Sequence, residues 1–401
     1  MKSQATLFSS HATLFAFPHA AQTRGGSLPW FLAAASLLNQ RVQAGGTIKY
    51  ALTLPSPIRM GEGGRCSPAR TAHFGQRDSR MADFAETLVA AIVIGSLYAL
   101  IALGYTMVYG ILKIINFAHS DVVVWGAWIS YVLAQRLLPA FGLDPHHPQQ
   151  APPLWMGGAI LVGAMLACGL LGLTIERLAY RPLRHAPRLN VLITAIGVSL
   201  LLQNIGQLKF VFGAIPERMP ALLPAWTFTL PILGQASGRP VTLDLIDLVI
   251  CGTAAVLLVA LEWLVFHTKL GTAMRAVSFD SETASLLGIN VDRVISFTFV
   301  LGSMLAAAAG FLHAMKYQGL NQPAHETWVL LGLKGFVAAV VGGIGNVRGA
   351  VLGGFVIAFV EQFGAHYASP HFRDVYVFGL LIGILLVRPT GLLGRPAVEK
   401  V

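Results

Sequence analysis

Few side chains in the apolar segments of this chain could do chemistry, and their spacing excludes several kinds of active site. No G-x-x-x-x-G-K-[ST] motif is present, and the Gly-rich stretch 342–349 lacks the Lys and the Ser or Thr that bind phosphate and Mg²⁺. No H-E-x-x-H motif or Cys/His cluster offers metal ligands, and His146 and His147 are adjacent, which is poor ligand geometry. We therefore expect no catalytic residue, no metal and no cofactor.

The main ionisable residues within apolar runs are Glu262 and Glu361, and Gln203 and Asn204 are uncharged polar neighbours of one another. A carboxylate in lipid is costly, so each Glu is a candidate functional residue. Glu262 could instead reach the membrane interface, and Glu361 could form a hydrogen bond between packed helices. The absence of a series of acids along the middle of the spans argues against a proton-driven pump.

Two polar, Gly-containing stretches interrupt the apolar runs, at 109–121 (YGILKIINFAHSD) and 342–349 (GGIGNVRG). Glycine breaks helices, and broken polar backbone inside a membrane is tolerated only where protein or a water-filled cavity satisfies it. Paired breaks in two halves indicate a transport pathway, although tight turns at the membrane surface would also explain them. The candidate pathway residues are Asn116, Phe117, His119, Asp121, Asn204, Gly343 and Gly345.

The spacing of Gly345, Gly349 and Gly353 removes side chains from one face of a helix. Another helix backbone can then approach closely. The stripe predicts a seam, either between subunits or, as is more common, within the chain.

The segment 268–291 (TKLGTAMRAVSFDSETASLLGINV) predicts one short amphipathic helix that ends at Gly288. Arg275, Asp280 and Glu282 make one side polar. An apolar face outside the membrane has to dock on a partner or lie on the membrane surface.

The composition determines the fold class. Charged residues are 11% of the chain, against roughly 25% in ordinary soluble domains. Apolar runs of 16–24 residues recur, and about 20 residues cross the hydrocarbon core as a helix. We predict an all-α polytopic membrane protein with eight or nine transmembrane helices and Gly-interrupted segments. The predicted spans are 88–109, 122–137, 155–175, 189–208, 243–265, 292–315, 328–344, 349–367 and 376–388.

The orientation follows from the basic residues between spans. The joint 176–188 holds four Arg and is the best candidate for a cytoplasmic loop, whereas the joints 138–154 and 213–241 are Pro-rich and nearly neutral. The joint 268–291 and the C-terminal tail are then also cytoplasmic, and nine spans place the stretch before Leu88 outside. One re-entrant segment would reverse the side of the N-terminus.

Residues 1–80 differ from the rest of the chain. They carry +7 of the net charge of +10 and no apolar run long enough to span a bilayer. A signal peptide, a basic disordered tail and a reading frame that begins upstream of a true start at Met81 all fit, and we favour the last. We expect 1–80 to be an extension without a role in function, and 81–401 to be a transmembrane permease domain.

The chain resembles the LivH-type permease, a subunit of the bacterial high-affinity branched-chain amino-acid ABC transporter. The resemblance covers about 81–401. The stretches that carry it are GSLYALIALGYTMVYGILKIINFAHSD (95–121), ERLAYRPLR (176–184), MRAVSFDSETASLLGIN (274–290), LKGFVAAVVGGIGNVRGAVLGG (333–354) and PTGLLGRPAVEKV (389–401).

The resemblance implies a multi-pass protein of the bacterial inner membrane that imports Leu, Ile or Val. It also implies a second, LivM-type permease, two cytoplasmic ATPase subunits that hydrolyse ATP, and a periplasmic amino-acid-binding protein, with membrane lipid around the chain and no nucleic acid. Ser120 and Arg348 depart from the family pattern, beside the two interruptions. The residues that match the family's ATPase-coupling helix are Arg275, Ala276, Asp280, Glu282, Ala284, Leu287, Gly288, Ile289 and Asn290.

Other functions fit parts of the sequence. A permease for another small amino acid, urea or a short amide would also suit a passage with few fixed charges. A stand-alone secondary transporter or channel would need no ATPase. An intramembrane hydrolase would need a Ser at a Gly-rich helix start, and Ser199 lies within a span without the following Gly.

Overall fold

A computed structural model describes residues 69–144, 152–184, 186–230 and 241–394. Residues 1–68, which belong to the extension predicted from the sequence, lie outside the described residues. The first described helix, α2 (Ala69–Leu112), begins before Met81, so the expected boundary between residues 80 and 81 falls within a helix.

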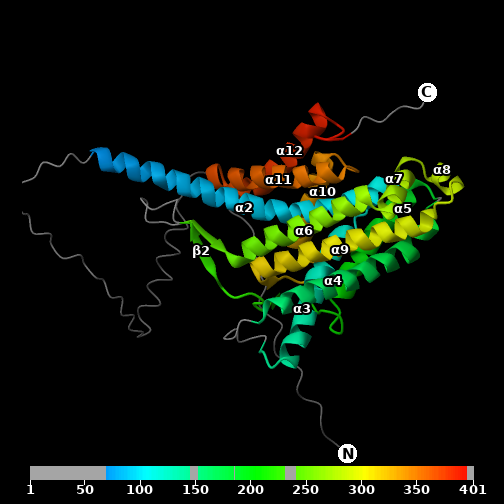
Figure 1. Ribbon diagram of the computed structural model, residues 1–401, viewed down its shortest axis with the longest axis horizontal. Helices are drawn as coiled ribbons and strands as arrows, with labels where there is room; N and C mark the ends of the chain where they lie inside the picture. Colours follow the sequence, from blue (N-terminus) through cyan, green and yellow to red (C-terminus); the bar gives the residue numbers. More distant parts are fainter. Residues whose placement is uncertain (1–68, 145–151, 185, 231–240, 395–401) are drawn as a thin grey trace, which may run out of the picture. The chain divides into compact units, whose positions relative to one another are not determined.

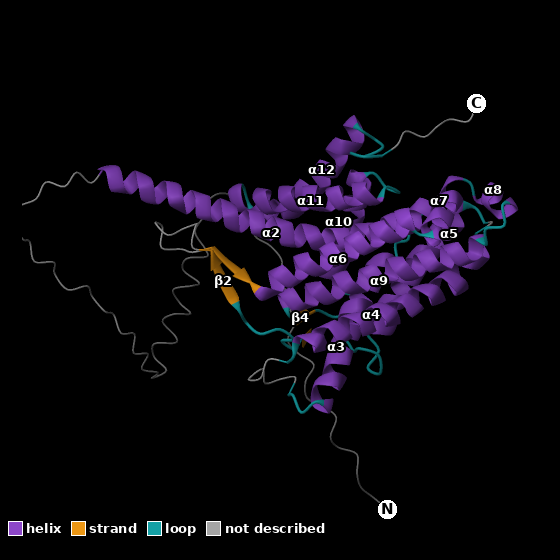
Figure 2. Cartoon of the chain, viewed as in Figure 1, coloured by secondary structure: helices purple, strands orange, loops and turns teal. Residues whose placement is uncertain are grey.

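Helices dominate the described residues, which confirms the predicted all-α membrane fold (Figure 2). Eight of the described helices are long and apolar enough to cross a membrane, and α10 is shorter, at 17 residues. At 1.5 Å per residue it extends about 25 Å. The helices after α2 are α3 (His119–Ala140), α4 (Leu154–Ile175), α5 (Arg188–Gly206), α6 (Leu245–His267), α7 (Lys269–Phe279), α8 (Ser281–Leu286), α9 (Val291–Tyr317), α10 (Glu326–Gly342), α11 (Val347–Tyr367) and α12 (Arg373–Val387).

Short elements complete the described fold. A π-helical turn, η1 (Glu176–Tyr180), and a 3₁₀ turn, η2 (Arg181–Leu183), continue α4, so much of the joint predicted at 176–188 is helical. A third turn, η3 (Pro370–Phe372), precedes α12. Two antiparallel strand pairs form, one between β1 (Glu217–Arg218) and β4 (Gly319–Leu320), the other between β2 (Thr227–Leu230) and β3 (Val241–Asp244).

The long helices α2 and α9 form the centre of the bundle, and α5, α6 and α12 lie at its rim. Helix α2 packs against α9, α10 and α11, while α9 also packs against α3 and α4 (Figure 1). Within the most apolar stretch of each helix, 72% of α2 and of α9 is buried, against 22% of α5 and of α6 and 6% of η3 with α12. The rim helices therefore expose apolar side chains to lipid or to other subunits.

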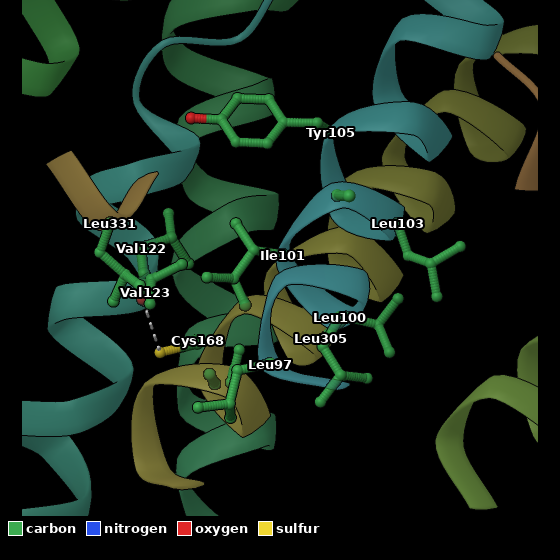
Figure 3. Packing of buried hydrophobic residues seen from close by; sticks show 14 of the residues in the cluster. Leu97, Leu100, Ile101, Leu103, Tyr105, Val122, Val123, Cys168, Leu305 and Leu331 are labelled. Carbon is green, nitrogen blue, oxygen red and sulfur yellow. Dashed lines mark hydrogen bonds between the residues drawn. The ribbon is translucent and has the colours of Figure 1, made fainter. Parts of the chain in front are cut away.

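Small residues let the central helices approach each other closely. Ala306–Ala309 of α9 are almost fully buried. A Cβ atom added to Gly126 would lie 2.4 Å from Ala307 Cα, and one added to Gly310 would lie 2.1 Å from Val123 O. Leucine, isoleucine and valine side chains fill the space that remains, as Figure 3 shows for Leu97 and Ile101 of α2 and for Val122 of α3. Close backbone contact of this kind is how helices associate in membranes, where burial of apolar side chains gives little net gain.

The two ends of the bundle are named here by the helix ends that lie at each. The C-terminus of α2 lies close to the C-terminus of α10 and to α7, and α8 packs on α7, so we call this end the inner end. The opposite end, which holds the C-terminus of α9, the N-terminus of α10 and the N-terminus of α12, is the outer end.

Candidate functional site

The first interruption turns the chain back into the bundle. Helix α2 ends at Leu112, and Lys113 adopts a left-handed backbone conformation with φ 55°. Helix α3 then begins at His119, whose ring lies against Gly104 of α2, since a Cβ added to Gly104 would lie 2.3 Å from it. The same Cβ would lie 3.1 Å from Gly302 O of α9. Gly104 lies eight residues before the end of α2, about 12 Å along the helix axis. The N-terminus of α3 therefore lies inside the bundle.

The polar side chains of this interruption face the interior. Asn116 is buried, and its Oδ1 accepts a hydrogen bond of 2.6 Å from the Tyr180 hydroxyl. His119 is buried with its ring 4.5 Å from that of Tyr105, and its Nε2 has no hydrogen-bond partner among the described residues. Phe117 lies 6.2 Å from the ring of Phe336 on α10.

Asp121, in the first turn of α3, meets α5. Its Oδ1 accepts a hydrogen bond of 2.9 Å from Gln203 Nε2, while its buried Oδ2 has no partner among the described residues. The predicted pathway included Asn204 rather than Gln203. Asn204 instead faces outward and donates to Leu200 O of its own helix, because adjacent residues on a helix point about 100° apart. Ser199 lies 3.4 Å from Gln203 Nε2, one turn away.

The second interruption is a turn of packed backbone at the inner end. Gly343 and Gly345 have positive φ values of 105° and 93°, which favour glycine. The backbone N–H groups of Leu392 and Leu393 donate to the carbonyls of Val341 and Gly342, so the segment after α12 covers this turn.

The two interruptions meet. A Cβ atom added to Gly110 would lie 3.8 Å from Gly345 Cα, and the reverse distance is the same. The stripe predicted from Gly345, Gly349 and Gly353 packs within the chain, because Gly349 lies against Gly342 O and Gly353 against Ala338 O.

The segment 268–291 forms two helices, so the prediction of a single helix is wrong. The backbone of Asp280 is extended and separates α7 from α8. Its Oδ1 accepts hydrogen bonds from the N–H groups of Glu282 and Thr283, so Asp280 caps α8 rather than lying on a polar helix face. Gly288, with φ 83°, ends α8, and Asn290 caps α9 through Arg293 N.

Both short helices bury one side and expose the other. Met274, Val277 and Ala284 are buried, and Ala276 and Ile289 are half-buried. Arg275, Glu282, Leu287 and Gly288 are exposed. In the segment 268–291, the most exposed apolar side chains are Phe279 at 90%, Leu286 at 87% and Leu287 at 76%. Neither Phe279 nor Leu286 was among the predicted coupling residues, and Leu287 was.

Helix α7 is fixed to the helices around both interruptions. Ser278 Oγ donates a hydrogen bond of 2.6 Å to Gly110 O. The guanidinium groups of Arg275 and Arg348 lie 5.5 and 5.2 Å from the centre of the Phe266 ring of α6. Arg348 also donates to Glu262 Oε1, so Glu262 forms an ion pair at the inner end. Movement of α7 would therefore reach both interruptions.

Residues 87–387 match the family model described as "Branched-chain amino acid transport system / permease component". The chain belongs to this family. It is 42% identical to the high-affinity branched-chain amino acid transport system permease protein BraD of Pseudomonas aeruginosa, over 79% of this chain and 98% of that protein. It is 39% identical to LivH of Escherichia coli over the same shares, and 28% identical to a probable LivH of Methanocaldococcus jannaschii over 77% and 91%.

This permease carries more buried charge than was expected from the sequence. Lys334 of α10 donates to Glu361 Oε1 of α11 at 2.9 Å, and Tyr98 of α2 donates to Glu361 Oε2 at 2.7 Å. Lys334 stands alone in the apolar run 328–344, which is a signal that could have identified it. Glu176 is also fully buried, where Arg184 pairs with it and Ser296 donates to it. Permeases of this family are transport subunits and not enzymes.

Proposed function

We propose that this chain is the membrane-spanning permease of an ABC importer that carries Leu, Ile and Val across the bacterial inner membrane. The observation that carries the proposal is the pair α7–α8, which presents Phe279, Leu286 and Leu287 to the outside of the bundle while its other side is bonded to the first interruption. The high-affinity branched-chain permeases BraD and LivH, both aligned over nearly their full length, support the substrate class.

The permease works with ATPase subunits and a substrate-binding protein, as a permease component of an ABC system does. We further propose that two ATPases and one LivM-type permease complete the membrane complex. The exposed faces of α5, α6 and α12 are available for the second permease and for lipid. We propose that residues 81–401 form the permease domain.

In this proposal, α7 and α8 are the coupling element. Apolar side chains exposed to water are a common sign of a docking surface. Closure of the ATPases on bound ATP would move α7, and the Ser278–Gly110 bond and the Phe266 contacts would transmit the movement to the interruptions. Glycine-hinged backbone with two packed states is a standard way to convert such a movement into alternating access.

The substrate path, in this proposal, follows the first interruption. Asn116, Phe117, His119 and Asp121 lie on buried or half-buried backbone that leads into the bundle. The N-terminus of α3 there adds the positive end of a helix dipole, which suits the carboxylate of an amino acid.

The test uses the whole complex in membrane vesicles with the binding protein and ATP. We expect ATP-dependent uptake of leucine, and no uptake under an ion gradient without ATP. Uptake driven by an ion gradient in the purified chain alone would instead support a secondary transporter. Uptake of urea or a short amide but not of leucine would overturn the substrate assignment.

Phe279→Ser tests the coupling surface. Loss of one fully buried aromatic contact is worth about 1.5–3 kcal/mol, or roughly 10- to 100-fold in affinity for the ATPase. Phe141→Ser is the matched control, because Phe141 is also exposed but lies at the end of α3 away from α7. We expect Phe279→Ser alone to reduce ATPase copurification and uptake, and equal behaviour of the two variants would contradict the role of α7–α8. Arg275→Ala and Gly288→Ala are expected to lower the uptake per ATP hydrolysed.

A further inference from the structure

A cavity of about 450 Å³ lies between α2, α9, α10, α11 and α12 towards the outer end. Its apolar wall includes Leu97 and Leu331, and its polar wall includes Tyr98, His313, Lys334 and Glu361. Volumes of roughly 300–1,000 Å³ with an apolar lining and a few convergent polar groups are typical of small-molecule sites. The cavity is separate from the first interruption and was not predicted from the sequence.

The ion-paired cluster in the cavity is balanced in charge, and the cavity wall also includes the carboxylate of Glu326. Lys334 Nζ lies 2.9 Å from Glu361 Oε1 and 2.8 Å from Asp374 Oδ1, and Arg373 Nε lies 3.6 Å from Glu361 Oε1. Two cations and two carboxylates therefore meet in one place. An amino-acid zwitterion carries one ammonium and one carboxylate, so it can exchange ion pairs with this cluster without leaving a net charge in the membrane.

Stability alone does not explain the cluster. A buried ion pair is often matched or exceeded in stability by well-packed apolar residues, and ionisable groups within membrane spans are functional candidates by default. Lys334 and Glu361 are nearly inaccessible, whereas Arg373 and Asp374 are about half exposed at the start of α12. The cluster thus has a fixed inner pair and a more accessible outer pair.

One polar atom of the cavity wall is unused. The buried Nδ1 of His313 has no hydrogen-bond partner among the described residues, and the His313 ring lies 4.6 Å from the ring of Tyr317 and 5.4 Å from that of Trp328. A ligand in the cavity would offer it a partner.

We propose that this cavity receives the α-ammonium and α-carboxylate groups of an amino acid with an apolar side chain on its way through the permease. Arg373 and Lys334 bind the carboxylate, Glu361 and Asp374 bind the ammonium, and the leucines contact the side chain. The assignment rests on the proposed function, because it takes the outer end as the side from which substrate arrives.

The experiment measures protection of a cysteine placed in the cavity wall. Leu330→Cys is introduced into the complete complex in nanodiscs, with Cys66, Cys168 and Cys251 replaced by alanine, and its rate of labelling by a small methanethiosulfonate reagent is followed. We expect L-leucine to slow the labelling. We expect 4-methylpentanoate, which lacks the ammonium, and 3-methylbutylamine, which lacks the carboxylate, to have no such effect at the same concentration.

Arg373→Gln then tests the charges without emptying the buried pair. Loss of one charge-assisted contact should raise the leucine concentration needed for half-protection about tenfold. Arg218→Gln is the control, because Arg218 is an exposed cation that contacts Gln318 outside the cavity. We expect Arg218→Gln to leave the half-protecting concentration unchanged.

The outcomes separate the site from the function. Equal protection by leucine and either analogue, no protection by leucine, or an unchanged half-protecting concentration in Arg373→Gln would overturn the site, even in a complex that takes up leucine with ATP. A complex that takes up no leucine, assayed in parallel with its binding protein, would overturn the proposed function instead.

Discussion

The two interruptions have the same kind of sequence, glycine beside polar residues, but they form different structures. The first, at 109–121, brings Asn116, His119 and Asp121 into the bundle, where their contacts are made by side chains. The second, at 342–349, brings backbone against backbone, because Gly342 and Gly349 leave no room for a Cβ atom. A Gly-rich break in a membrane helix can therefore serve either polar chemistry or close packing, and the side chains that flank the glycines decide which.

The largest effect on stability is expected from a substitution that disrupts the packing of the second interruption. In Gly342→Ala, the new Cβ would lie 2.0 Å from Gly349 O and 2.9 Å from Ala350 N. Inserting a methyl group into such a contact costs at least about 3 kcal/mol, the upper end for overpacked cores. We expect the complex to lose its thermal stability, measured as the fraction that remains monodisperse after heating.

Gly379→Ala is the control for that variant. Gly379 lies on α12 with nothing within 4 Å of an added Cβ atom. Alanine is favoured over glycine in a helix by about 1 kcal/mol, so this variant should be as stable as the parent or more so. Similar melting of the two variants would show that the contact between α10 and α11 is looser than the structure indicates.

An intermediate effect is expected at the first interruption. In Asp121→Asn, the amide oxygen can still accept from Gln203, so we expect stability to be retained. Loss of the negative charge should lower ATP-dependent leucine uptake about tenfold, the effect of one charge-assisted contact. Asn204→Ala is the control, since that side chain faces away from Asp121. Loss of stability in Asp121→Asn, with uptake per folded complex unchanged, would assign Asp121 to packing.

The contrast also shows what a single sequence can predict. Apolar run length identified every long helix, because the bilayer fixes that length, and the glycines marked both interruptions. The contact of Gln203 rather than Asn204 with Asp121 was not predictable, because it depends on the rotation of α5 against α3, which is set by packing. The break at Asp280 was missed because an Asp within an amphipathic pattern can be a polar face or a cap.

The contacts between polar residues that are far apart in the sequence were also not predictable. Lys334 and Glu361 are 27 residues apart, and Tyr98 and Glu361 are 263 apart. Each lies within an apolar run, and only the packing of α2, α10 and α11 makes them one cluster. Glu262 likewise became interpretable only through its contact with Arg348.

The smallest effect on stability is expected from a substitution at Lys113, where the backbone of the first interruption is strained. Lys113 has φ 55°, a conformation that costs an L-residue about 1–2 kcal/mol. Lys113→Gly removes that strain, but glycine gives back about 0.5–1 kcal/mol through the entropy of the unfolded chain. The net gain should be about 0.5 kcal/mol, seen as a small rise in the melting temperature of the complex. Lys113→Ala keeps the strain and also removes the charge, so it should show no gain. A rise in melting temperature of the same size in both variants would show that the gain comes from removal of the ammonium group and not from relief of backbone strain. The backbone of the first interruption would then be as relaxed as that of the second, where glycine already occupies both left-handed positions.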